Sequence, residues 1–314
     1  MSKIFKVYNL NFINVDDFQP FTIADYTFAP IPEKQPQKRN FYPSHYFLKC
    51  NRNMVINAYV TIPVEQQDSV LRKGGKSSSY RKIKFIEDIL MLISIFIGRN
   101  VVLQSHKKRL EFPLCAAKHC EMIAQNSDEL EHYLRSAIAQ IELPEWQEKH
   151  DKGFHIRQFY SASNIFTGEA RFLADVTIWE FLYYCEHKRS MPYEKLEWIS
   201  LNTKINYLTK KYLLDGRASS IPEERLRIFA DLRNQLSHSG KLPIQKPKSP
   251  FTHLNIQGCF AYIRLFKHLT QALVLRTLGI TGVVEKLSVF DVRSHFDELV
   301  DSGEVKFYES LTDE

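Results

Sequence analysis

The spacing of apolar residues changes once along this 314-residue chain, and that change limits the folds it can adopt. Before about residue 82, runs rich in aromatic and β-branched residues alternate with clusters of Pro and Asn, a pattern typical of short strands. From about residue 127 onward, apolar residues recur at helical spacing. We therefore expect an α+β N-terminal domain followed by an all-α domain.

The N-terminal part predicts strands over residues 21–28, 41–48 and 54–62. A helix is predicted over 83–97, and two further short strands over 101–104 and 110–114. Together these elements predict that residues 1–125 form an α+β domain of unknown type, serving as a sensor or in substrate binding.

The C-terminal part predicts five helices, over about 128–142, 165–187, 194–213, 220–240 and 254–278. The fourth has clear end signals. Ser220 can cap its start, with Pro222 and Glu223 in the first turn, and Gly240 can end it. Long helices with short connections favour an antiparallel helix bundle, predicted over 161–285. Residues 126–160 are predicted to be a helical linker region, and 286–314 a C-terminal extension with an acidic tail.

Composition and charge limit the cellular compartment and the kinds of partner that we expect. The net charge of +6 fits a polyanionic partner without requiring one. Five cysteines, an odd number in a long chain, argue against a disulfide scaffold and for a reducing compartment. The N-terminus lacks a signal-peptide pattern, and the most apolar stretch, 83–98, is too short and too charged to span a bilayer. We expect a cytoplasmic protein with no membrane partner.

The most informative motif lies near the end of the fourth predicted helix, where Arg233, Asn234 and His238 occur together. Asn234 and His238 are four residues apart and share a helix face, and the long side chain of Arg233 can reach the same place. Arginine binds phosphate through a fixed fork, and histidine exchanges protons near neutral pH. A surface arginine and an ordinary helix-end histidine would give the same spacing.

These residue types suit RNA cleavage without a metal or cofactor. The 2′-hydroxyl attacks the adjacent phosphate once deprotonated, and the leaving 5′-oxygen then needs a proton. Two proton-transfer roles call for two histidines, which a homodimer would supply by pairing two motifs across its two-fold axis. The paired arginines would stabilise the charge of the transition state. The partners expected on this chemistry are RNA and a second copy of the chain.

The run Arg233–Asn234–Gln–Leu–Ser–His238, followed by Ser–Gly240, resembles the signature of HEPN domains, helical bundles that include metal-independent RNases of prokaryotic defence. The layout of residues 160–285 is most similar to the ApeA-like branch, which is linked to abortive defence against phage. The resemblance implies that Arg233 and His238 are catalytic, with Asn234 supporting, and that a trigger of phage or other origin activates the protein. Glu180 is a weaker supporting residue. A tyrosine that one toxin branch carries two residues after the histidine is replaced here by Gly240.

Two other segments contain residues that could form a binding or metal site. The basic segment 72–84 predicts an exposed loop that could contact RNA, or a plain solvated loop; its candidate residues are Arg72, Lys73, Lys76, Tyr80, Arg81 and Lys82. Cys115, His119 and Cys120 lack the paired spacing of a zinc site, so no metal is expected.

Two alternatives to a nuclease stay open. A catalytically silent HEPN-like module could bind RNA or a protein and hold a dimer together. Nucleotide transfer or hydrolysis centred on the N-terminal domain is more remote, because no glycine-rich phosphate loop supports it.

Overall fold

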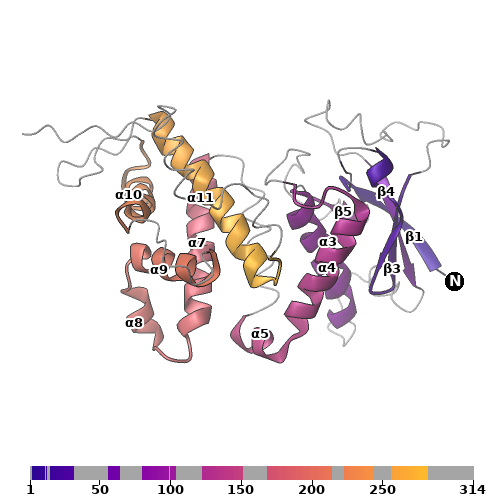
Figure 1. Cartoon of the computed structure of the whole chain (residues 1–314), viewed down its shortest axis with the longest axis horizontal. Helices are drawn as coiled ribbons and strands as arrows, with labels where there is room; N and C mark the ends of the chain where they lie inside the picture. The colour runs from indigo at the N-terminus through magenta and orange to yellow at the C-terminus, as the bar shows by residue number, and fades with distance from the viewer. Residues whose placement is uncertain are drawn as a thin grey trace, which may run out of the picture. The chain divides into compact units, whose positions relative to one another are not determined.

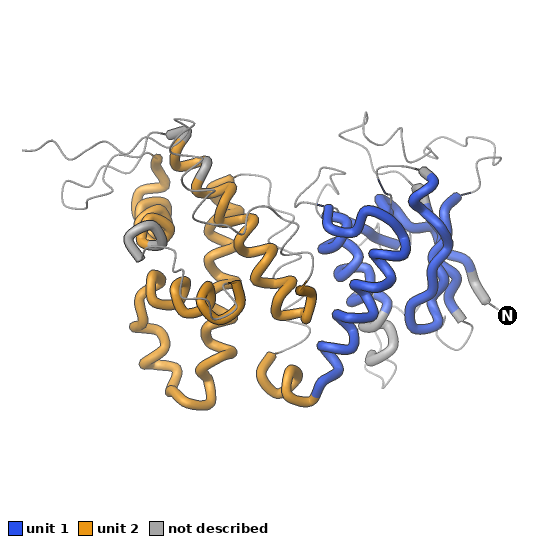
Figure 2. The backbone as a smooth tube through the Cα atoms, in the orientation of Figure 1, with its two compact units in different colours: residues 1–143, 152–160 blue, residues 144–151, 161–314 orange. Residues whose placement is uncertain are grey.

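The computed structural model describes residues 2–10, 12, 15–31, 56–63, 80–98, 100–103, 122–150, 168–213, 223–242 and 256–281. The chain divides into two compact units, shown in different colours in Figure 2. Unit 1 comprises residues 1–143 and 152–160, and unit 2 comprises 144–151 and 161–314. The predicted strands at 41–48 and 110–114 and the C-terminal extension lie outside the described residues.

Unit 1 contains a five-stranded antiparallel sheet in the order β2-β3-β4-β1-β5. Its strands are β1 (Ser2–Tyr8), β2 (Phe21–Ile23), β3 (Tyr26–Pro30), β4 (Ile56–Pro63) and β5 (Val102–Leu103). A 3₁₀ turn, η1, covers Val15–Asp17. β4 and β5 confirm the strands predicted at 54–62 and 101–104. The strand β1 was not predicted, because Ile4 is exposed among charged neighbours and obscures the alternation.

The prediction of one strand over 21–28 is wrong, because the segment is a hairpin. Ile23 pairs with Tyr26, and the two residues between them, Ala24 and Asp25, have φ values of 45° and 69°. Positive φ at both central positions is the geometry of a type I′ turn, whose twist matches that of paired strands. The stacked rings of Phe21 and Phe28, 5.1 Å apart, fix the register.

Two helices, α3 (Tyr80–Ile97) and α4 (Ser127–Glu142), lie together on one face of the sheet (Figure 1). Alternate residues of β4 are buried, as expected for a sheet with one covered face. The start of α4 is fixed by Asn126, whose side chain accepts a hydrogen bond from the Glu129 amide at 2.8 Å. A mixed α+β architecture is therefore confirmed. Among the described residues, no helix has the length and apolar character needed to cross a bilayer.

The predicted linker region at 126–160 is divided between the units. Helix α4 belongs to unit 1, where Ser127 accepts a hydrogen bond from the Gln19 amide and Arg135 donates to the Thr22 carbonyl. Residues 144–151, which include α5 (Pro144–Lys149), belong to unit 2. The apolar stripe of α4 (Leu130, Leu134, Ala137, Ile141) is a buried packing face.

Unit 2 contains helices and no strand among its described residues. After α5 come α7 (Gly168–His187), α8 (Tyr193–Glu197), α9 (Leu201–Leu208), a π-helical turn η3 (Thr209–Leu213), α10 (Glu223–Ser239) and α11 (Ile256–Thr277). The predicted helices at 165–187, 220–240 and 254–278 are thus present with slightly different ends.

An aromatic cluster forms the core of unit 2. Phe266 of α11 packs against Phe172, Trp179 and Phe229, with ring centroids 4.8–5.3 Å apart. The Trp179 indole also donates a hydrogen bond to the Thr270 hydroxyl at 2.9 Å. All these aromatic side chains are almost fully buried. The cluster ties α7, α10 and α11 into one packed body.

The expectation of a wholly antiparallel bundle fails for α7 and α11. Gly168 lies beside Phe260, Phe172 beside Phe266, and Trp179 beside Thr270, so contacts advance together along both helices. The chain therefore runs in the same direction along both helices, which cross at an angle (Figure 1). Short connections make only consecutive helices antiparallel, whereas α8, α9, η3 and α10 separate this pair in sequence.

The predicted single helix at 194–213 is also wrong, because α8 ends at Glu197 and α9 starts at Leu201. Ser200 caps α9: its hydroxyl accepts a hydrogen bond from the Thr203 amide at 3.2 Å. A serine that bonds the backbone in this way starts a helix at the expense of a continuous one. The break leaves Trp198 at the surface.

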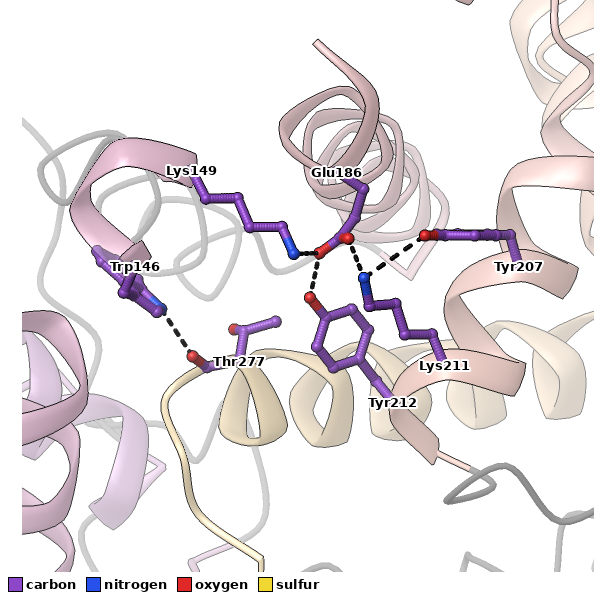
Figure 3. A network of polar contacts seen from close by, with 7 residues as sticks. All are labelled: Trp146, Lys149, Glu186, Tyr207, Lys211, Tyr212 and Thr277. Atoms are coloured by element: carbon purple, nitrogen blue, oxygen red, sulfur yellow. Dashed lines mark hydrogen bonds and ion pairs between the residues drawn. The ribbon is translucent and has the colours of Figure 1, made fainter. Parts of the chain in front are cut away.

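A polar network joins α5 to the rest of unit 2 (Figure 3). The Glu186 carboxylate accepts hydrogen bonds from Tyr212 and Lys211 and forms an ion pair with Lys149. The Trp146 indole donates to the Thr277 carbonyl at 2.8 Å. Burial would raise the pKa of Glu186, but hydrogen bonds from Lys149, Lys211 and Tyr212 outweigh it and hold that pKa below its usual value.

His150 is buried and packs against Trp146, with the two ring centroids 4.8 Å apart. Burial lowers its pKa to about 4, and the Lys149, Lys188 and Lys211 cations act in the same direction against Glu186. Unfolding restores an ordinary pKa of about 6.5, so the unfolded chain binds more protons between these values.

Stability should therefore fall as pH drops from about 6.5 to 4, by at most about 3 kcal/mol from this residue. His150→Gln should flatten that part of the profile. Urea unfolding at several pH values, followed by circular dichroism, measures it. The matched control is His132→Gln, an exposed histidine of α4, which should leave the profile unchanged. An unaltered slope in His150→Gln would contradict the assignment.

Candidate functional site

Helix α10 carries the motif, and its end is well defined. Gly240 has a φ of 62° and donates its amide to the Leu236 carbonyl at 3.0 Å. A left-handed glycine of this kind ends a helix, as the sequence predicted. The predicted capping residues Ser220 and Pro222 lie outside the described residues. The core face of α10, including Phe229 and Leu232, is buried.

Arg233 lies at the centre of a set of polar contacts. Its Nη1 donates to Asn234 Oδ1 at 3.1 Å, and its Nη2 lies 3.5 Å from Glu180 Oε1 on α7. Lys204 of α9 places its Nζ 3.7 Å from the same Glu180 oxygen. Glu180 thus holds cations from two other helices at one point, and the two halves of the Arg233 fork have different partners.

These residues lie at a pocket of about 730 Å³, a size typical of small-ligand sites. Three elements, α7, α10 and the α8–α9 corner, contribute its lining: Glu180, Glu197, Trp198, Ile199, Ser200, Leu201, Asn202, Lys204, Arg227, Ala230, Asp231, Arg233 and Asn234. The lining combines three Lys or Arg side chains with three carboxylates. It also includes the first turn of α9, whose amides form the positive end of a helix dipole.

His238 is exposed and is not among the lining residues. It lies four residues, one helical turn or about 6 Å of rise, beyond Asn234 toward the end of α10. Arg227, Asp231, Asn234 and His238 recur at helical spacing and so share a face. The structure therefore brings Arg233, Asn234 and Glu180 together, and places His238 one turn further along the same helix face.

Sequence reasoning missed Lys204, Arg227 and Trp198 as site residues. The spacing of Arg227 to Asp231 and Asn234 was a usable signal, because it extends the polar face of α10 by two turns. Lys204 and Trp198 had no such signal. They reach the pocket through the packing of α8 and α9 against α7 and α10.

The basic segment 72–84 was predicted to be an exposed loop, and the structure describes only its last residues. Arg72, Lys73 and Lys76 lie outside the described residues. Tyr80, Arg81 and Lys82 form the first turn of α3, so the prediction of a loop through residue 84 is wrong from Tyr80 onward. Helix α3 therefore begins at Tyr80, before the predicted start at residue 83.

Among the described residues, no group of three or more His, Cys, Asp or Glu side chains could hold a metal ion. Cys115, His119 and Cys120 lie outside that part of the chain.

Comparison of the chain with protein-family models, with curated proteins and with solved structures finds no match.

Proposed function

We propose that the protein is a metal-independent endoribonuclease of the HEPN type, acting as a homodimer with a composite active site. The observation that carries this is the polar face of α10, where Arg233 and Asn234 are in hydrogen-bond contact and His238 follows one turn later. Arg233 is positioned through Glu180, and the exposed His238 is accessible to a substrate or to a second protomer.

The proposed reaction is attack of an RNA 2′-hydroxyl on its own phosphate, which releases the 5′-oxygen and leaves a 2′,3′-cyclic phosphate. One His238 accepts the 2′-hydroxyl proton, and His238 of the second protomer protonates the leaving 5′-oxygen. Arg233 stabilises the charge that builds on the phosphate oxygens. DNA lacks the attacking hydroxyl and is not cleaved.

A role in abortive anti-phage defence follows from the family resemblance alone. On this proposal, unit 1 senses a trigger or binds substrate, and the nuclease acts in the cytoplasm.

The test is cleavage of total RNA by the purified full-length protein in excess EDTA. Wild type should cleave and leave 2′,3′-cyclic or 3′-phosphate ends, and His238→Ala should be slower by about 100- to 10,000-fold. His132→Ala, which removes an exposed histidine of unit 1, is the matched control and should cleave normally. Equal cleavage by wild type and His238→Ala would refute the proposal.

A catalytically silent, RNA-binding or protein-binding dimerisation module is the second candidate. The observation in its favour is that Glu180 already neutralises Arg233, while His238 lies outside the pocket. A dimer that binds RNA with a steep salt dependence but never cleaves it would support this function.

A further inference from the structure

Trp198 is 86% exposed, whereas the other tryptophans, Trp146 and Trp179, are at most 4% exposed. Tryptophan is highly buried on average, so an indole that is almost fully exposed to solvent indicates a surface that binds a ligand. The indole follows α8 directly, at the corner where Ser200 interrupts the helix. The corner thus presents an aromatic plane to solvent.

The surroundings of Trp198 identify the chemistry of its ligand. It lines the same pocket as Lys204, Arg227 and Arg233, and the first turn of α9 opens there. An aromatic plane beside cations and helix-end amides is what a single-stranded nucleotide requires, because its base stacks and its phosphate binds positive charge.

The carboxylates of the pocket favour a base over a bare polyanion. Glu180 is engaged by Arg233 and Lys204, but Glu197 lies next to Trp198 in sequence and lines the pocket. A carboxylate repels polyphosphate and accepts hydrogen bonds from the exocyclic amino group of a base. Balanced charge around an indole therefore fits a nucleobase with its phosphate, rather than a string of phosphates.

We propose that Trp198 is the stacking platform for one unpaired base of the RNA substrate, whose adjoining phosphate binds at Arg227 and Arg233. This inference rests on the proposed ribonuclease function and names how its pocket holds the substrate. RNA recognition through splayed, stacked bases implies that single-stranded segments bind and that intact duplexes bind weakly.

The chain offers a direct readout, because Trp198 is the exposed member of three tryptophans. The probe is a 2′-O-methyl oligoadenylate, which can stack but cannot be cleaved through its 2′-oxygen. Adding it to the full-length protein should quench the acrylamide-accessible part of the fluorescence saturably. Inorganic polyphosphate at equal charge should not. Quenching by both, or by neither, would overturn the proposal.

Affinity for the same oligonucleotide, labelled and followed by anisotropy, completes the test. Trp198→Ala should weaken binding by about 5- to 150-fold, and Trp198→Phe should restore most of it. The matched control is Tyr193→Ala, which removes another exposed aromatic that does not line the pocket and should bind as wild type. Unchanged affinity in Trp198→Ala, or equal losses in both alanine variants, contradicts the stacking role.

Two further outcomes separate this inference from the proposed function. Cleavage by wild type in EDTA combined with normal binding by Trp198→Ala would sink the stacking role and leave the nuclease standing. If the oligonucleotide stacks on Trp198 but all-ribose RNA is not cleaved, the stacking role stands and the nuclease function fails. Acrylamide protection of Trp198 in the free protein that disappears on dilution would assign the indole to a contact between two copies, and would also overturn it.

Discussion

Arg233→Ala is expected to lower the turnover rate for RNA cleavage by about 100- to 1,000-fold, the usual effect of removing one donor to a developing oxyanion. Arg233 uses the two ends of its guanidinium separately, Nη1 toward Asn234 and Nη2 toward Glu180. These contacts hold the group in place before substrate arrives. The loss should therefore appear in kcat more than in KM, because a preorganised charge acts mainly on the transition state.

Arg233→Lys separates geometry from charge. Lysine keeps the cation but cannot donate to Asn234 and Glu180 through a planar fork, so it should recover only a small part of the lost rate. Arg189→Ala is the matched control, since Arg189 is an exposed arginine of unit 2 paired with Glu148 away from the pocket. Single-turnover cleavage in EDTA gives the rates. Full activity in the lysine variant would mean that charge alone suffices and that the observed fork has no catalytic role.

Local signals in the sequence were enough to predict much of the secondary structure of unit 2. Gly240 and Gly279 have positive φ and follow α10 and α11, as glycines after a helix end predict. The motif residues Asn234 and His238 share a face of α10 because helical spacing alone dictates it. These features depend on a few neighbouring residues and need no knowledge of the tertiary structure.

The features that the sequence did not predict depend on which helices pack against one another. Glu180 and Arg233 are far apart in sequence and meet only because α7 packs beside α10 through the aromatic cluster at Phe266. Periodicity shows which face of a helix is apolar, but not which helix covers it, and for this reason the parallel course of α7 and α11 was missed. The burial of His150 likewise depends on its packing beside Trp146, which the polar sequence of α5 does not show.

The network around Glu186 makes a second strong prediction, which concerns stability. The Glu186 side chain is 2% exposed and is contacted by Lys149, Lys211 and Tyr212 from two other elements. Without its charge, Lys149 and Lys211 would repel one another across a partly buried space. The pKa of Tyr212 is raised as well, chiefly by burial and in addition by its hydrogen bond to Glu186. The phenol therefore stays a neutral donor at physiological pH.

Glu186→Gln should therefore lower the free energy of unfolding of unit 2 by about 2–3 kcal/mol at pH 7. Breaking a fully buried ion pair costs about 3–5 kcal/mol, but the two lysine side chains are 33% and 37% exposed and can partly rehydrate. All three tryptophans belong to unit 2, so urea unfolding followed by tryptophan fluorescence reports on this unit.

Glu148→Gln is the matched control for that measurement. It makes the same chemical change on α5, in a pair with Arg189 whose side chains are 59% and 61% exposed, and should cost no more than about 0.5 kcal/mol. Equal losses in the two variants would show that Glu186 contributes no more than a surface charge. A large loss in Glu186→Gln alone would establish that this carboxylate fixes α5 and η3 onto α7. Because the network lies apart from the lining of the Arg233 pocket, the folded fraction of that variant should retain the RNA affinity of wild type.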